Sequence, residues 1–239
     1  MRLPTPSSIL DAKTAKELVR FYLDNRPFEI PNSDFWELNQ LPEVSCFGER
    51  PKEFTGFNCW EFDELTEDGA KVIAKSGMDV VNLDTVAHVP LEAIRILCKA
   101  KSIKTLCLAS LHEITPETAK ILASFKGQSL NLNGLSQPSA ELAECLATFP
   151  GSLSLGGLCH LEMDGAVGLA KHKGDLGLDG IMVLFEEEAL AISKHQGTSL
   201  SFNSLFETPS KVKTILRQYQ GVLKAPWAKK KTSKPKKKK

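Results

Sequence analysis

Apolar residues recur along the chain in a repeating unit. Each unit opens with an apolar residue, has a second two positions later and a third three positions after that, as in VNLDTV and LNLNGL. Seven aligned units start at Phe57, Val81, Leu106, Leu130, Leu153, Leu176 and Leu200. The period of two predicts a short strand at the start of each unit. Turn-forming pairs such as Asn133-Gly134, Gly156-Gly157 and Asp179-Gly180 predict a bend before the third apolar residue.

The second half of each unit has the spacing of a helix. Positions eight, eleven and twelve after the third apolar residue are mostly apolar or small, as in Ala143, Leu146 and Ala147, and they share one helix face. Thr115-Pro116 and Thr208-Pro209 match an N-cap followed by proline at the first helical position. Sixteen positions after the third apolar residue stand Gly127, Gly151, Gly174, Gly197 and Gly221. We expect these glycines to end the helices as C-caps.

This alternation of strand and helix resembles the leucine-rich repeat family. The resemblance covers about residues 54–222 and implies an α/β leucine-rich-repeat-like solenoid of about seven repeats, with a cap at each end. The family usually has Asn or Cys at the position that is apolar here, which is occupied by Leu111, Leu135, Leu158 and Ile181. The chain is therefore most similar to the divergent bacterial-type repeats of 23 to 25 residues.

The two ends of the chain differ from the repeats. Residues 1–53 are predicted to form a helical and irregular N-terminal cap, because TAKELVRFY resembles TAKILASF of a later repeat, whereas residues 26–53 are proline-rich. The last repeat has Lys213 and Arg217 where earlier repeats have small residues, which is typical of a terminal repeat with no following neighbour. Residues 223–239 are predicted to be a disordered Lys-rich tail.

Composition and charge indicate a globular body with a basic end. Of the 239 residues, 42% are hydrophobic and 25% are charged, which is ordinary for a globular protein. Residues 229–239 contain eight lysines and no acid, so without them the net charge changes from +1 to −7. We find no secretory signal and no run of eighteen apolar residues, and therefore expect no transmembrane segment and a cytoplasmic location. Six scattered cysteines without a C-x-x-C pair also fit a reducing compartment.

Two histidines raise the question of a metal site. His172 and His195 occupy the same position in adjacent repeats and could in principle share a metal. The same position is Phe125, Phe149 and Tyr219 in other repeats, which favours a column of packed rings instead. The sequence also has no G-x-S-x-G, H-E-x-x-H or dinucleotide-binding motif. We therefore predict a protein that is not an enzyme and has no cofactor or metal.

The strand residues between the buried positions are predicted to form the concave face, where repeat proteins commonly bind partners. The predicted protein-binding residues are Asn58, Trp60, Asn82, Asp84, Asn131, Asn133, Asp179 and Asn203. Trp60 is the expected anchor, because binding hot spots favour tryptophan over small polar residues. The alternative is that this face is a smooth ladder with little function.

The lysine tail is a second predicted binding surface. Its polyanion-binding residues are Lys229, Lys230, Lys231, Lys234, Lys236, Lys237, Lys238 and Lys239. Such a tail attracts nucleic acid through counterion release, or an anionic membrane surface more weakly. It also resembles a nuclear localisation signal. The alternatives are a solubilising role, or a tail that folds back onto the acidic body.

These observations predict a non-enzymatic protein–protein interaction scaffold, with an unidentified protein partner and a basic tail for electrostatic attachment. The alternative is a nucleic-acid-associated protein that binds through the Lys-rich C-terminal tail. A third hypothesis places an adaptor or enzyme-subunit activity in the proline-rich N-terminal region.

Overall fold

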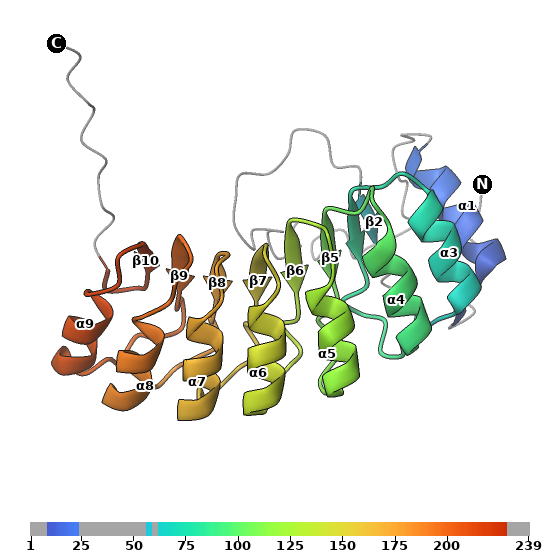
Figure 1. Cartoon of the computed structure of the whole chain (residues 1–239). Helices are drawn as coiled ribbons and strands as arrows, with labels where there is room; N and C mark the ends of the chain where they lie inside the picture. Colours follow the sequence, from blue (N-terminus) through green and yellow to red (C-terminus); the bar gives the residue numbers. More distant parts are fainter. Residues whose placement is uncertain (1–8, 24–55, 59–61, 229–239) are drawn as a thin grey trace, which may run out of the picture.

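The computed structural model describes residues 9–23, 56–58 and 62–228, and the structural statements below refer to these residues. Strands stand in a row along one side of the molecule and helices along the other (Figure 1). The main sheet consists of β2 (Gly56–Asn58), β4 (Val80–Asn82), β5 (Thr105–Cys107), β6 (Ser129–Asn131), β7 (Ser152–Ser154), β8 (Leu176–Gly177), β9 (Ser199–Ser201) and β10 (Val222–Lys224). These eight strands are parallel and lie side by side in chain order.

A helix follows most strands of this sheet. The helices are α1 (Ala12–Leu23), α3 (Glu67–Lys75), α4 (Leu91–Lys99), α5 (Pro116–Ala123), α6 (Ala140–Ala147), α7 (Met163–Ala170), α8 (Glu186–Ile192) and α9 (Ser210–Leu216). Each helix from α3 to α8 packs against the next one in the chain, and α1 packs against α3. The predicted α/β repeat architecture, with a parallel sheet alternating with helices in a solenoid-like row, is confirmed.

The strand register reproduces the sequence alignment of the repeats. Leu106 of β5 pairs with Leu130 of β6, which in turn pairs with Leu153 of β7. These leucines are fully buried, and so are the small helix residues Ala143 and Ala166 that face the neighbouring helices. The core is therefore a continuous layer between sheet and helices, built from the same positions in every repeat.

The helix starts agree with the prediction in one case and differ in another. Thr115 is the N-cap of α5, where its hydroxyl oxygen accepts the Thr118 N–H at 3.2 Å, and Pro116 follows as predicted. The prediction of Thr208 as the N-cap of α9 was wrong, because Pro209 occupies that position. The buried Thr208 hydroxyl donates to the carbonyl of Leu205 at 3.1 Å.

The prediction that the recurring glycines are helix C-caps was also wrong. The C-cap of α7 is Lys171, and Gly77 is the one glycine of the described residues that has a positive φ, 81°. The recurring glycines are needed because consecutive turns approach closely. A Cβ atom on Gly174 would lie 1.9 Å from the carbonyl oxygen of Gly151, and one on Gly197 would lie 1.8 Å from that of Gly174.

The N-terminal end of the row is closed by α1. Asp11 caps this helix by accepting the Thr14 N–H at 2.8 Å, and this hydrogen bond lowers the pKa of the Asp11 carboxyl below its usual range. Before it, β1 (Ile9–Leu10) pairs in parallel with β3 (Glu64–Leu65) in a separate two-stranded sheet. Helix α1 lies within the predicted cap of residues 1–53, whereas residues 1–8 and 24–53 lie outside the described residues.

At the other end, the ordered fold continues past the predicted start of the tail at residue 223, which lies inside β10. The indole N–H of Trp227 donates to the carbonyl of Leu205 at 3.0 Å. Lys213 Nζ lies 5.8 Å and the Arg217 guanidinium carbon 5.7 Å from the centre of the Trp227 ring. The aromatic ring thus lies against both charged residues expected at the last repeat, of which Lys213 is half-buried and Arg217 is exposed. The lysines of residues 229–239 lie outside the described residues.

Candidate functional site

The predicted binding residues of the concave face stand at two recurring positions. Asn82 and Asn131 end strands β4 and β6, while residues such as Asp84 and Asn133 open the turns that follow these strands. Asp179 and Asn203 hold the same turn position after β8 and β9. The Asn58 side chain and the whole of Trp60, the expected anchor, lie outside the described residues.

The turn residues use their side chains to bind the next repeat. Asp84 Oδ1 accepts the N–H of Ala109 at 2.7 Å. Asn133 Oδ1 accepts the N–H of Gly156 at 2.6 Å and the hydroxyl of Ser154 at 2.7 Å. A side chain in one repeat thereby satisfies a backbone donor in the following repeat, which fixes the stacking of the two.

Asp179 makes the same contacts two repeats after Asn133. Its Oδ1 accepts the N–H of Asn203 at 3.0 Å and the hydroxyl of Ser201. Burial raises the pKa of Asp84 above its usual value, although the hydrogen bond from Ala109 acts in the opposite direction. These carboxamide and carboxylate groups form an inter-repeat ladder at a position different from the asparagine position of the leucine-rich repeat family.

The strand positions of the concave face offer little side-chain surface. Asn131 is 7% exposed, Ser154 5% and Ser201 1%. Asn131 also uses its Oδ1 to accept the N–H of Asn133 at 2.9 Å. Within the part of the chain that the structure describes, most polar groups predicted for protein binding are therefore engaged in hydrogen bonds within a repeat or between repeats.

The column of flat rings predicted at the helix ends is confirmed. The centroids of Phe125 and Phe149 are 6.1 Å apart, those of Phe149 and His172 are 6.5 Å apart, and the planes are nearly parallel. His172 and His195 follow at 5.9 Å, and Tyr219 lies 5.8 Å from His195. The described residues contain no group of three His, Cys, Asp or Glu side chains that could hold a metal ion. The two histidines are packing residues.

Both imidazoles are held in their neutral form by burial. Burial lowers the pKa of His172, and it lowers the pKa of His195 to about 4, with a smaller contribution from the neighbouring His172. His195 Nε2 lies 3.1 Å from the carbonyl oxygen of Gly174, while the Tyr219 hydroxyl donates to the equivalent carbonyl of Gly197 at 2.7 Å. Each of these two rings thus contacts the recurring glycine of the preceding repeat.

An exposed apolar surface that the sequence analysis did not identify lies on the later repeats. Most of the large exposed apolar side chains of the described residues fall between residues 163 and 206, although such side chains are normally scattered. We call this set the Phe185 surface: Met163, Val167, Met182, Val183, Phe185, Leu190 and Phe206. Its two aromatic members are highly exposed, Phe185 at 68% and Phe206 at 69%.

Two pairs of these side chains occupy equivalent positions in neighbouring repeats. Met182 and Phe206 directly follow the third buried apolar residue of their repeats, and Val167 and Leu190 share one position of α7 and α8. Earlier repeats have charged residues at this helix position, namely Lys71, Arg95, Lys120 and Glu144. Because α7 packs against α8, the apolar positions gather on adjacent elements. The change from charged to apolar residues at equivalent positions of successive repeats is the sequence signal that could have identified this surface.

Phe185 stands at a position that caps the helix in three other repeats, whereas Pro90, Glu162 and Pro209 make no side-chain cap hydrogen bond there. Thr66, Thr115 and Ser139 occupy the N-cap of α3, α5 and α6, and each accepts a backbone N–H of the first helical turn. Phe185 is the N-cap residue of α8 and makes no side-chain cap hydrogen bond. The aromatic ring therefore replaces a stabilising polar group without being buried itself.

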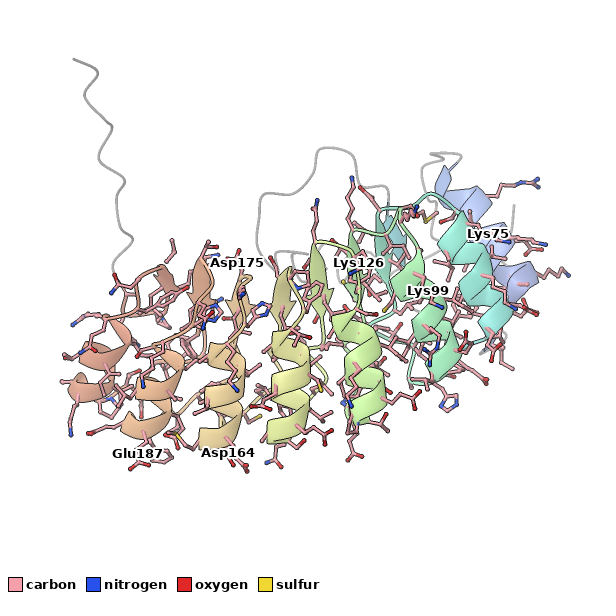
Figure 2. The ribbon with its side chains drawn as sticks, viewed as in Figure 1. Lys75, Lys99, Lys126, Asp164, Asp175 and Glu187 are labelled. Atoms are coloured by element: carbon pink, nitrogen blue, oxygen red, sulfur yellow. The ribbon has the colours of Figure 1, made fainter. Side chains whose placement is uncertain are left out.

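Acidic side chains surround the Phe185 surface. Four exposed carboxylates adjoin it and have no hydrogen-bond or ion-pair partner among the described residues: Glu162, Asp164, Glu187 and Glu207. Glu186 is paired with Lys211. Figure 2 shows Asp164 and Glu187 at the lower edge of the molecule, where α7 and α8 begin, whereas Lys75, Lys99 and Lys126 lie toward the strands. Acids at helix starts and lysines at helix ends follow the helix dipole, and they leave this edge negative.

No family model matches this chain, and no curated protein matches it. No helix among the described residues is long and apolar enough to cross a membrane.

Proposed function

We propose that this protein is a non-enzymatic protein–protein interaction scaffold built on a leucine-rich-repeat-like solenoid. The observation that carries the proposal is the Phe185 surface, in which Phe185 and Phe206 are 68% and 69% exposed. Single exposed apolar residues are ordinary, but apolar side chains gathered on adjacent elements are typical of an interaction site. Aromatic residues and methionine are also enriched in protein interfaces.

The proposal places the binding surface at the edge where α7 and α8 begin and not on the concave face. The polar groups of Asp84, Asn133 and Asp179 already bind the backbone of neighbouring repeats. A partner at that face would have to compete with these hydrogen bonds, whereas the Phe185 surface offers apolar side chains that are exposed to solvent. The rigid stack of repeats holds the surface in one shape.

Affinity capture with variants tests the scaffold. The full chain and a Phe185→Thr, Phe206→Ser variant serve as baits in the native lysate, with Val222→Ser as a matched control because Val222 is exposed outside the surface. We expect one or more proteins that both the wild type and the control recover and the double variant loses. Recovery of the same proteins by all three baits would reject this surface as the binding site.

The second candidate is a nucleic-acid-associated protein that binds through its tail. It is favoured by the eight lysines of residues 229–239, and by exposed lysines at the helix ends such as Lys75, Lys99 and Lys126. Random DNA and RNA are titrated with the full chain and with residues 1–228 at several salt concentrations. The tail hypothesis predicts binding that weakens steeply with salt and is lost on truncation. Absence of binding at low salt would reject it.

A further inference from the structure

We propose that the partner segment of the Phe185 surface is a basic amphipathic helix that lies across the starts of α7, α8 and α9. This inference rests on the proposed scaffold function and adds the chemistry of the ligand. It follows from the cost of Phe185, the spacing of the apolar side chains and the charge around them.

Phe185 is unfavourable for the isolated protein in two ways. Ser and Thr at an N-cap stabilise a helix by about 1 kcal/mol relative to a residue that cannot accept a hydrogen bond. Phe185 makes no such bond, and its ring remains 68% exposed, so it gains little from burial. Neither capping nor packing explains the residue, whereas an aromatic side chain that a partner covers would contribute strongly to binding.

The apolar side chains repeat along the row of helices. Met163 is the first residue of α7 and Phe185 is the N-cap of α8, while Phe206 lies four residues before the start of α9 at Ser210. Packed helices are about 8 to 10 Å apart. An α-helix presents residues i and i+7 on one face at a rise of about 10 Å, which matches this interval. An amphipathic helix that crosses the repeats can therefore place one apolar residue against each of them.

The charge around the surface selects a basic partner. Glu162, Asp164, Glu187 and Glu207 adjoin the apolar side chains and lack partners among the described residues, and Lys211 is engaged with Glu186. A helix with Lys or Arg beside its apolar stripe would pair with these carboxylates, whereas an acidic helix would be repelled. The lysines of residues 229–239 have the right charge but no apolar residue among them.

Fluorescence anisotropy with synthetic peptides tests the inference. The probe is a labelled 18-residue amphipathic helix of leucine and lysine, and the comparison peptide has glutamate in place of every lysine. The proteins are the full chain, Phe185→Thr and the control Val222→Ser. Phe185→Thr introduces the cap residue of Thr66 and Thr115, so the variant is expected to fold at least as stably as the wild type.

We expect the leucine–lysine peptide to bind the wild type and Val222→Ser equally, and Phe185→Thr roughly tenfold more weakly. Binding should weaken with added salt, and the glutamate peptide should show no binding that depends on Phe185. Equal binding of the leucine–lysine peptide to wild type and Phe185→Thr, or no binding to either, would overturn the inference. So would a dimer of the wild type, detected by sedimentation, that Phe185→Thr abolishes.

The two proposals fail differently. If lysate capture depends on Phe185 but the leucine–lysine peptide does not bind, the scaffold stands and the partner chemistry is rejected. In the opposite case, binding of the peptide depends on Phe185 but capture of proteins from the lysate does not. The surface then has the proposed chemistry, and the scaffold function is rejected.

Discussion

The imidazole rings of His172 and His195 stack in the protein interior, with centroids 5.9 Å apart and planes inclined by 15°. Both rings are buried, and burial lowers the pKa of each. Protonation would place two positive charges in contact between buried aromatic rings. The column therefore works as a packing element only while both imidazoles are neutral.

The first prediction concerns the pH dependence of stability. Burial lowers the pKa of His195 from its usual 6.5 to about 4, so between these pH values the unfolded chain binds more protons than the folded protein. The stability present above pH 6.5 is therefore lost as the pH falls toward 4, by on the order of 3 kcal/mol for His195. Urea unfolding at pH 7.5, 6.0 and 5.0 measures this loss.

The control for this prediction replaces both histidines by phenylalanine, the residue found at the equivalent position of two earlier repeats. A His172→Phe, His195→Phe variant should lose much of the decline below pH 6.5, because Phe125 and Phe149 already occupy equivalent positions. His160→Gln should keep it, because His160 is exposed. An unchanged decline in the double variant would show that other groups cause the loss.

The repeat, the strands and the ring column could be predicted because every repeat places the same position in the same environment. The glycine role could not, since a C-cap and a close approach between turns both require glycine, and only the fold shows that Gly174 faces the carbonyl of Gly151. The Phe185 surface has no local motif. It becomes visible only when α7 and α8 are known to be adjacent and Phe185 is known to be exposed.

Two glycine-to-alanine substitutions should have opposite effects. Gly197→Ala would place a Cβ atom 1.8 Å from the carbonyl oxygen of Gly174, so it should destabilise the protein by about 2 kcal/mol or more. Gly165→Ala adds a methyl group inside α7 whose nearest neighbour, Leu161, is 3.7 Å away. It should stabilise the helix by up to about 1 kcal/mol. Thermal unfolding distinguishes the two, and equal melting temperatures would contradict the close-approach explanation.

The inter-repeat ladder predicts the effect of changes at Asn133. Asn133→Ala leaves the N–H of Gly156 and the buried hydroxyl of Ser154 without their acceptor, which should cost about 1 to 3 kcal/mol. Asn133→Asp keeps an acceptor in the same place, as Asp179 does for Asn203. It should be nearly neutral at pH 7. Chemical denaturation checks both, and a loss for aspartate as large as for alanine would argue against the ladder.

Phe185→Thr should raise stability even though it removes an aromatic residue. The new hydroxyl can accept an N–H in the first turn of α8, as Thr66 and Thr115 do in their helices, and the exposed ring contributes little to the core. The expected gain in the free energy of unfolding is about 1 kcal/mol. Leu178→Ala, at a buried position of the repeat that contains Phe185, should instead be strongly destabilising. A loss of stability in Phe185→Thr would mean that Phe185 has a structural role.

The last prediction concerns where the folded body ends. A chain of residues 1–222 lacks most of β10, so it loses the hydrogen bond from the Phe202 N–H to the Lys224 carbonyl and exposes the edge of β9. It also lacks Trp227, whose indole N–H donates to the Leu205 carbonyl and whose ring lies against Lys213. We expect a much lower melting temperature for 1–222 than for 1–228, and no difference between 1–228 and the full chain.

Single substitutions separate the contribution of Trp227 to stability from that of strand β10. Trp227→Ala should cost about 1 to 3 kcal/mol, because it removes a partly buried ring, its hydrogen bond and its cation–π contacts. Pro226→Ala, at an exposed neighbour, should have little effect. If 1–222 melts like the full chain, the last repeat needs neither β10 nor Trp227, and the charges of Lys213 and Arg217 alone are sufficient to end the stack.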